Sequence, residues 1–259
     1  MLNSVSPPSY AAATSFCCIS LHESDKLRLL NVPQELIPDF AALLTRSWQK
    51  GVQRVQRYGP SLEYKLSGRP WRGQGDDAIT CRLLARDILS FMFSRGWRLA
   101  VSTDLSKKQG DSDSWFFESF VIPHSTRAPL AGGAGSSKMD PHFGAISFNR
   151  SDRIRLIGLP PDLQATIVQC VKQSWARGIQ HHGPFDSDPR AYELKLAGNP
   201  WHTYGTDTIL SRSLALSLLH CIKMNGWEIY ASVDLGGRIG TNDCPAGDLD
   251  SWIIKAVVL

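Results

Sequence analysis

The sequence of 259 residues lacks the short motifs that identify the common enzyme classes. It contains no Gly-Lys-Ser/Thr of a phosphate-binding loop, no Gly-x-Gly-x-x-Gly, no His-Glu-x-x-His and no Gly-x-Ser-x-Gly. These patterns carry nucleotide binding, zinc-dependent hydrolysis and serine-nucleophile chemistry. Without them the sequence designates no catalytic residue, no cofactor and no metal site, and we favour a protein that is not an enzyme.

Long apolar runs and paired cysteines are also missing. None of the six cysteines belongs to a Cys-x-x-Cys pair, so neither a zinc cage nor a disulfide framework is predicted. No stretch approaches the roughly 20 apolar residues that span a bilayer, and residues 1–15 lack the pattern of a signal peptide. We therefore expect no membrane segment and a cytoplasmic or nuclear location. The net charge of +4 permits an anionic partner without requiring one.

What the sequence does contain is an internal duplication, marked by its tryptophans. The eight tryptophans form four matched pairs: Trp48 with Trp175, Trp71 with Trp201, Trp97 with Trp227, and Trp115 with Trp252. The surrounding sequence matches as well, because EYKLSGRPW (63–71) corresponds to ELKLAGNPW (193–201), and GWRLAVSTDL (96–105) corresponds to GWEIYASVDL (226–235). One fold unit is therefore present twice.

The chain divides accordingly into four parts. Residues 1–15 are predicted to be a flexible leader, residues 16–122 the first repeat, and residues 143–259 the second repeat. Residues 123–142 are rich in Gly, Ser and Pro, which favours a linker because such a segment buries no apolar face. Each repeat has the length of an ordinary small domain.

The pattern within each repeat predicts an α+β fold of the order β-β-α-β-α-β-β. A first helix is expected to open at Pro33 and to run to Val52, since apolar residues recur at three- and four-residue steps. A second helix is expected to end at Gly96 or Gly226. Right-handed strand–helix–strand connections would make some strands parallel. We therefore expect a mixed sheet with two helices on one face, and two repeats related by a pseudo-two-fold axis.

Acidic residues gather near the loop between the last two strands of each repeat. They are Asp104, Asp111 and Asp113 in the first repeat and Asp234, Asp248 and Asp250 in the second. Paired carboxylates bind hard cations or share a proton, but aspartate also closes turns by accepting backbone hydrogen bonds. A metal-dependent hydrolase or transferase at this loop is one alternative function.

Two further matched pairs are candidate binding residues. Arg82 and Arg212 occupy the same place on the second helix, with Asp104 and Asp234 as the expected carboxylate partners, in a structural ion pair or in an anion site. Trp71 and Trp201 lie in Gly-x-Pro-Trp loops, which makes them candidates for a partner surface.

A basic stripe in the first repeat suggests another alternative. Arg46, Lys50, Arg54 and Arg57 recur at helical spacing near the end of the predicted first helix. Such a stripe binds phosphate backbones, or forms a solvated helix face. Our leading hypothesis is a non-catalytic intracellular binding or scaffold protein, whose partner is another protein. The nucleic-acid binder and the metal-dependent enzyme remain the alternatives.

Overall fold

The chain is described by a computed structural model, which covers residues 15–72, 77–106, 113–120, 141–186, 188–235 and 249–257. The first repeat contains six strands and two α-helices. In chain order they are β1 (Phe16–His22), β2 (Lys26–Leu30), α1 (Ile37–Ser47), β3 (Val52–Tyr58), β4 (Ser61–Leu66), α2 (Asp77–Ser94), β5 (Trp97–Thr103) and β6 (Ser114–Ser119). Short 3-10 helices precede α1 (Gln34–Leu36) and α2 (Pro70–Arg72).

The second repeat has the same order of elements. They are β7 (Phe143–Asn149), β8 (Arg153–Ile157), α3 (Pro161–Ser174), β9 (Ile179–Phe185), β10 (Asp188–Leu196), α4 (Asp207–Met224), β11 (Trp227–Val233) and β12 (Ser251–Ala256). The first sheet has the strand order β3-β4-β2-β1-β6-β5, and the second has the equivalent order β9-β10-β8-β7-β12-β11. The predicted α+β duplication is confirmed at this level.

The sheets differ from the expected mixed sheets, because every strand pair in them is antiparallel. The sequence prediction missed one strand per repeat, β3 and β9. Helix α1 ends at Ser47, because Trp48 has an extended backbone and Gly51 follows with φ +84°. The residues assigned to the end of that helix instead form β3, which makes a hairpin with β4 and reverses the direction of β4.

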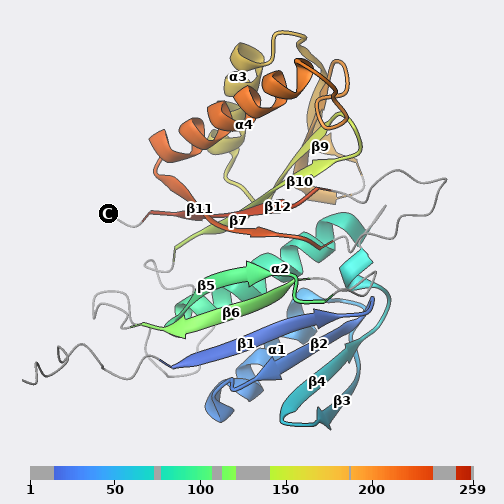
Figure 1. The fold of residues 1–259 in the computed structure, drawn as a ribbon, viewed down its shortest axis with the longest axis vertical. Coiled ribbons are helices and arrows are strands. Elements are labelled where there is room, and N and C mark those ends of the chain that lie inside the picture. Colours follow the sequence, from blue (N-terminus) through green and yellow to red (C-terminus); the bar gives the residue numbers. More distant parts are fainter. Residues whose placement is uncertain are drawn as a thin grey trace, which may run out of the picture.

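The two repeats pack into alternating layers of sheet and helix. Figure 1 shows α2 between the two sheets, with α3 and α4 beyond the second sheet. One face of the second sheet packs on α3 and α4 around Ile146, Ile154 and Leu194. Its other face packs on the first repeat, where α2 contacts β7, β8 and β10 and the edge strand β5 contacts β11.

This arrangement differs from the expected pseudo-two-fold relation of the repeats. A two-fold axis would bring equivalent surfaces together, whereas here the helix face of one repeat meets the sheet face of the other. The contact is therefore head-to-tail. Among the described helices and strands, nothing packs on one surface at each end: the outward side of the first sheet and the outward side of α4. Within the described residues, no helix has the length and apolar character to cross a membrane.

Candidate functional site

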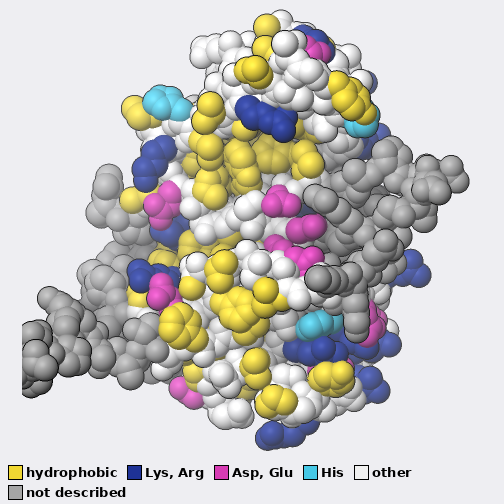
Figure 2. Space-filling model, viewed as in Figure 1, with side chains coloured by type: hydrophobic (Ala, Val, Ile, Leu, Met, Phe, Trp, Pro, Cys, Tyr) yellow, Lys and Arg dark blue, Asp and Glu magenta, His cyan; other side chains and the backbone are white. Residues whose placement is uncertain are grey.

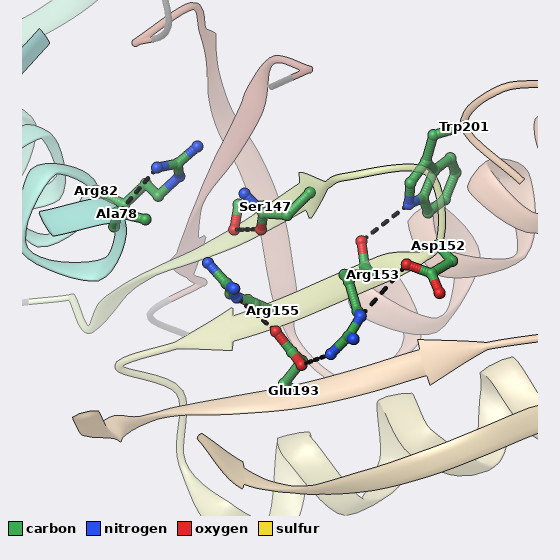
Figure 3. A network of polar contacts seen from close by, with 9 residues as sticks. Ala78, Arg82, Ser147, Asp152, Arg153, Arg155, Glu193 and Trp201 are labelled. Carbon is green, nitrogen blue, oxygen red and sulfur yellow. Dashed lines mark hydrogen bonds and ion pairs between the residues drawn. The ribbon is translucent and has the colours of Figure 1, made fainter. Parts of the chain in front are cut away.

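The contact between the repeats is built around Arg82, which projects from α2. Its side chain is 2 % exposed, and it donates hydrogen bonds to the Ala78 carbonyl oxygen (2.9 Å) and to Ser251 Oγ (3.2 Å). Figure 3 shows the side chain extending from α2 toward Ser147 on β7. Asp104, the partner expected from the sequence, is exposed and accepts a hydrogen bond from the backbone N–H of Ser106. Arg82 therefore serves the packing of the two repeats.

The equivalent Arg212 lies in a different environment. It is exposed on α4 and donates a hydrogen bond to the carbonyl oxygen of Thr208, one turn earlier (3.2 Å). Arg82 makes the same bond to Ala78. The two arginines therefore share a local conformation, and only Arg82 is covered by a second sheet.

Asp113 forms a second polar link between the repeats. Its Oδ2 accepts hydrogen bonds from Ser102 Oγ and from the backbone N–H of Asp234, both at 2.8 Å. Burial, together with the carboxylates of Asp234 and Asp250, raises the pKa of Asp113 above its usual range. Asp250 accepts the matching bond from Ser232 Oγ (3.1 Å) and is exposed. Hydrogen bonds within the hairpins and across the contact between the repeats thus account for Asp113 and Asp250.

The metal-site hypothesis gains no geometric support from these loops. Asp111 and Asp248, which belong to the predicted acidic clusters, lie outside the described residues. Among the described residues, no three His, Cys, Asp or Glu side chains form a group suited to a metal ion. The buried cysteines are also poor nucleophiles, because burial raises the pKa of Cys81 to about 12.

The four tryptophans in the loops and at the helix ends are structural. Each donates its indole N–H to a backbone carbonyl: Trp48 to Ser67, Trp175 to Ala197, Trp71 to Lys26, and Trp201 to Arg153. Trp71 is fully buried, and Trp201 is half-buried against Phe148. The sequence made Trp71 a candidate for a partner surface, but the Pro-Trp turn directs its indole into the core, so Trp71 offers no such surface.

The predicted basic stripe does not exist as a helical face. Arg46 lies in the last turn of α1, Lys50 follows the helix and pairs with Asp77 (2.6 Å), and Arg54 and Arg57 lie on the edge strand β3. Side chains three residues apart on a strand point to opposite sides. The geometric argument for a continuous phosphate-binding stripe is therefore lost.

Each sheet also carries a matched ion-pair network that belongs to no catalytic sequence motif. Glu63 accepts from Arg28 (2.7 Å) and Gln56 (2.8 Å) on the first sheet. Burial opposes ionisation of Glu63, but these two hydrogen bonds outweigh it and hold its pKa below the usual range. On the second sheet, Arg155 and Arg153 both bind Glu193 (Figure 3). The networks join neighbouring strands of each sheet.

A pocket of about 510 Å³ lies beside α1 and α2, where Arg190 of the second repeat completes its wall. Arg46, Arg86, Arg95 and Arg190 line this pocket. Three of them already pair with carboxylates: Arg86 with Asp87, Arg95 with Asp39, and Arg190 with Asp188. Because most of its positive charge is compensated, the pocket is a weaker candidate than the two end surfaces.

The first end surface is the outward side of the first sheet, here called the open sheet face. A row of outward side chains crosses four of its strands: Leu30, Cys18, Phe116 and Val101. Leu30 is 37 % exposed and Val101 is 48 % exposed, whereas Phe116 is half-buried and Cys18 is buried. Figure 2 views this side of the molecule and shows hydrophobic side chains on the lower lobe, over the strands of the first sheet.

The second end surface is the outward side of α4, here called the α4 face. Ile209, Arg212, Leu216 and Leu219 recur at three- and four-residue steps and share this side of the helix. Ile209 is 65 % exposed and Leu216 is 66 % exposed. Contiguous apolar side chains on a protein surface mark an interaction site. The sequence contained this signal as apolar residues all around α4, but it did not show which side would stay uncovered.

Comparison with protein-family models agrees with the duplication. One protein-domain family model matches the chain twice, over residues 15–118 and 142–255, and its description names a domain without an activity. A crystal structure of a conserved kinetoplastid-specific protein from Trypanosoma cruzi is similar, with 13 % sequence identity and a TM-score of 0.31. That similarity covers 44 % of this chain and 96 % of the other. A comparison with curated proteins gave no match.

Proposed function

We propose that this chain, which belongs to that domain family through both of its halves, is a non-catalytic intracellular protein that binds other proteins. The binding surfaces are the open sheet face and the α4 face. They replace the Pro-Trp loops as the contact surface, since Trp71 is buried in the core. The hairpin aspartates act within the interface between the repeats.

One observation carries this proposal: the two repeats leave large apolar side chains exposed at both ends of the stack. The α4 face presents Ile209 and Leu216, and the open sheet face presents Val101. Equivalent positions at the contact between the repeats are buried, among them Ile79 and Ala231. A surface that is buried in one repeat and open in the other is suited to bind a partner.

The enzyme alternative is supported less well. The polar side chains that the sequence offered for chemistry, Arg82 and Asp113, bind other parts of the fold. A metal-dependent reaction at the hairpin predicts thermal stabilisation by divalent cations and turnover that is lost in Asp104→Ala or Asp234→Ala. Either result would favour the enzyme over the binding protein.

The binding function is tested with two surface variants, Leu216→Glu on the α4 face and Val101→Lys on the open sheet face. The tagged wild-type chain is incubated with a cell extract, and the proteins retained are quantified beside those retained by each variant. We expect specific retention of protein that falls at least about tenfold in one or both variants, while the melting temperature stays unchanged. Retention of nothing by the wild-type chain, or equal retention by all three, contradicts the proposal.

A further inference from the structure

We propose that the α4 face of one chain binds the open sheet face of a second copy of the same chain, repeating the contact that joins the two repeats within each molecule. This inference rests on the proposed binding function and specifies the partner. The internal contact is the template: the outward face of α2 covers the second sheet. The structure therefore contains one example of the interface, together with an equivalent of each of its two sides that no described helix or strand covers.

The sheet side of the template is reproduced strand by strand. In the second sheet the row that packs against the first repeat is Ile157, Ala145, Ile253 and Ala231. In the first sheet the row with the same pairing is Leu30, Cys18, Phe116 and Val101. All four positions are apolar in both sheets. The open sheet face is thus the same surface without its helix.

The helix side of the template is reproduced as well. Ile79 and Leu89 of α2 are fully buried, while the equivalent Ile209 and Leu219 of α4 are 65 % and 37 % exposed. At the next position on this face, the exposed Leu216 takes the place of Arg86, whose guanidinium lies against Gly158 of the second repeat. The α4 face is therefore apolar at the positions that would contact the sheet of a second copy.

The polar centre of the template has its equivalents too. Arg82 reaches Ser251 Oγ, beside the hydrogen-bonded pair of Ser147 Oγ and Asn149 (2.7 Å). On the open sheet face the equivalent residues are Ser114, Ser20 and His22, and Ser20 Oγ is again hydrogen-bonded to its neighbour (2.8 Å). Arg212 is the exposed equivalent of Arg82. In the complex, its guanidinium takes the place of Arg82 over Ser114 of the next copy.

The hairpin link has an equivalent on each side. Within one molecule, Asp113 Oδ2 accepts the backbone N–H of Asp234. The equivalent of Asp113 is the exposed Asp250, and the equivalent of Asp234 is the exposed Asp104. In the complex, Asp250 of one copy is expected to accept the N–H of Asp104 of the next. The apolar row, Arg212 and the hydrogen bond between Asp250 and Asp104 all require the same orientation of the two copies.

Substitutions make the contact between copies weaker than the internal one. Two apolar residues of α2 have polar equivalents in α4. Ser213 stands in place of Leu83, and Lys223 stands in place of Phe93, which packs on Phe143 and Tyr230. The internal contact also has the benefit of a covalent linker, which supplies a high effective concentration. We therefore expect association that appears at high protein concentration and is reversible. Because the two faces differ, the contact is head-to-tail: each added copy presents a new free face, and association continues in one direction until the rotation between copies closes a ring.

Sedimentation velocity tests this inference with the full chain, over a concentration series from about 1 µM to about 1 mM. The wild-type protein is expected to form dimers and longer species as concentration rises. Leu216→Glu and Val101→Lys alone are each expected to remain monomeric. An equimolar mixture of the two is expected to form a one-to-one dimer and nothing larger, since each variant retains one working face and the two working faces are complementary.

Other outcomes of the same experiment overturn the inference. A Val101→Lys variant that still dimerises alone indicates a symmetric contact through α4. A monomeric wild type at all concentrations excludes self-association. If the wild type stays monomeric while Leu216→Glu loses retained proteins from the extract, the binding function stands and the partner is a different protein. Ile209→Asp and Leu30→Lys, one on each face, replace either variant if it lowers the melting temperature.

Discussion

Helices α2 and α4 are the same element of one fold in two settings, and their difference shows what the internal contact does. Both have 18 residues and end just before a glycine with positive φ, Gly96 or Gly226. Helix α2 is covered by its own sheet on one side and by the second sheet on the other. Among the described elements, no second sheet covers helix α4, which packs on its own sheet and on α3. Whether a given helix position is buried thus depends on which layers pack around the repeat, as well as on the fold of the repeat.

The largest expected effect comes from placing a charge at the matched isoleucines. Ile79→Asp puts an unpaired carboxylate between two sheets and is expected to cost more than about 4 kcal/mol of unfolding free energy, enough to prevent folding. Ile209→Asp changes an exposed side chain and is expected to stay within about 0.5 kcal/mol. Urea unfolding followed by circular dichroism measures both values. Similar losses in the two variants would refute the difference in burial.

A second, smaller difference is expected at the matched arginines. Arg82→Ala removes a buried guanidinium and leaves Ser251 Oγ without this donor in a buried place, at a cost of about 3 kcal/mol. Arg212→Ala removes an exposed side chain, and a change of less than about 0.5 kcal/mol is expected. Thermal unfolding of both variants checks this, with Arg82→Lys as a control that retains the charge and loses the second bond. An unchanged melting temperature in Arg82→Ala would show that the arginine does not join the repeats.

A third comparison concerns Gly144, which stands where the first repeat has Cys17. A Cβ added at Gly144 would overlap Leu159 Cδ2, so Gly144→Cys must displace the end of that side chain. We expect a loss of about 1 kcal/mol. The first repeat has Val32 in place of Leu159, and Gly144→Cys combined with Leu159→Val should recover part of the loss. Equal stability of the single and double variants in urea would show that Leu159 is not the obstacle.

Much of the fold could be predicted from the sequence, because the duplication supplied two independent examples of each element. The paired tryptophans located both repeats, and Gly96 and Gly226 located two helix ends. The missed strands β3 and β9 have a physical cause. The apolar steps of α1 continue in the sequence through Trp48 to Val52, whereas the extended backbone of Trp48 and the positive φ of Gly51 show that the helix has ended. The same error suggested the basic stripe.

Less of the site could be predicted, because its location depends on how the repeats are stacked. Arg82 and Arg212 are indistinguishable in sequence, yet one is buried and the other exposed. The buried Trp71 was placed on the surface for a similar reason, since a loop position does not reveal where an indole points. A residue that is matched in both repeats has a role in the fold. The layer that packs beside it decides whether this role is packing or binding.

The smallest expected effect separates Asp113 from Asp250. Burial and two neighbouring carboxylates raise the pKa of Asp113, so the folded protein holds this proton more tightly than the unfolded chain. Its contribution to stability is therefore greatest at acidic pH and is lost as the pH rises through the raised pKa. Asp113→Asn should flatten the dependence of melting temperature on pH over the range that begins at the ordinary pKa of an aspartate and extends above it. Asp250→Asn should flatten it only in part, because it removes one repelling carboxylate and leaves the buried group in place. If both variants change the slope equally, the pH dependence does not arise from the buried Asp113 that links the repeats, and the exposed Asp250 of the second repeat contributes as much.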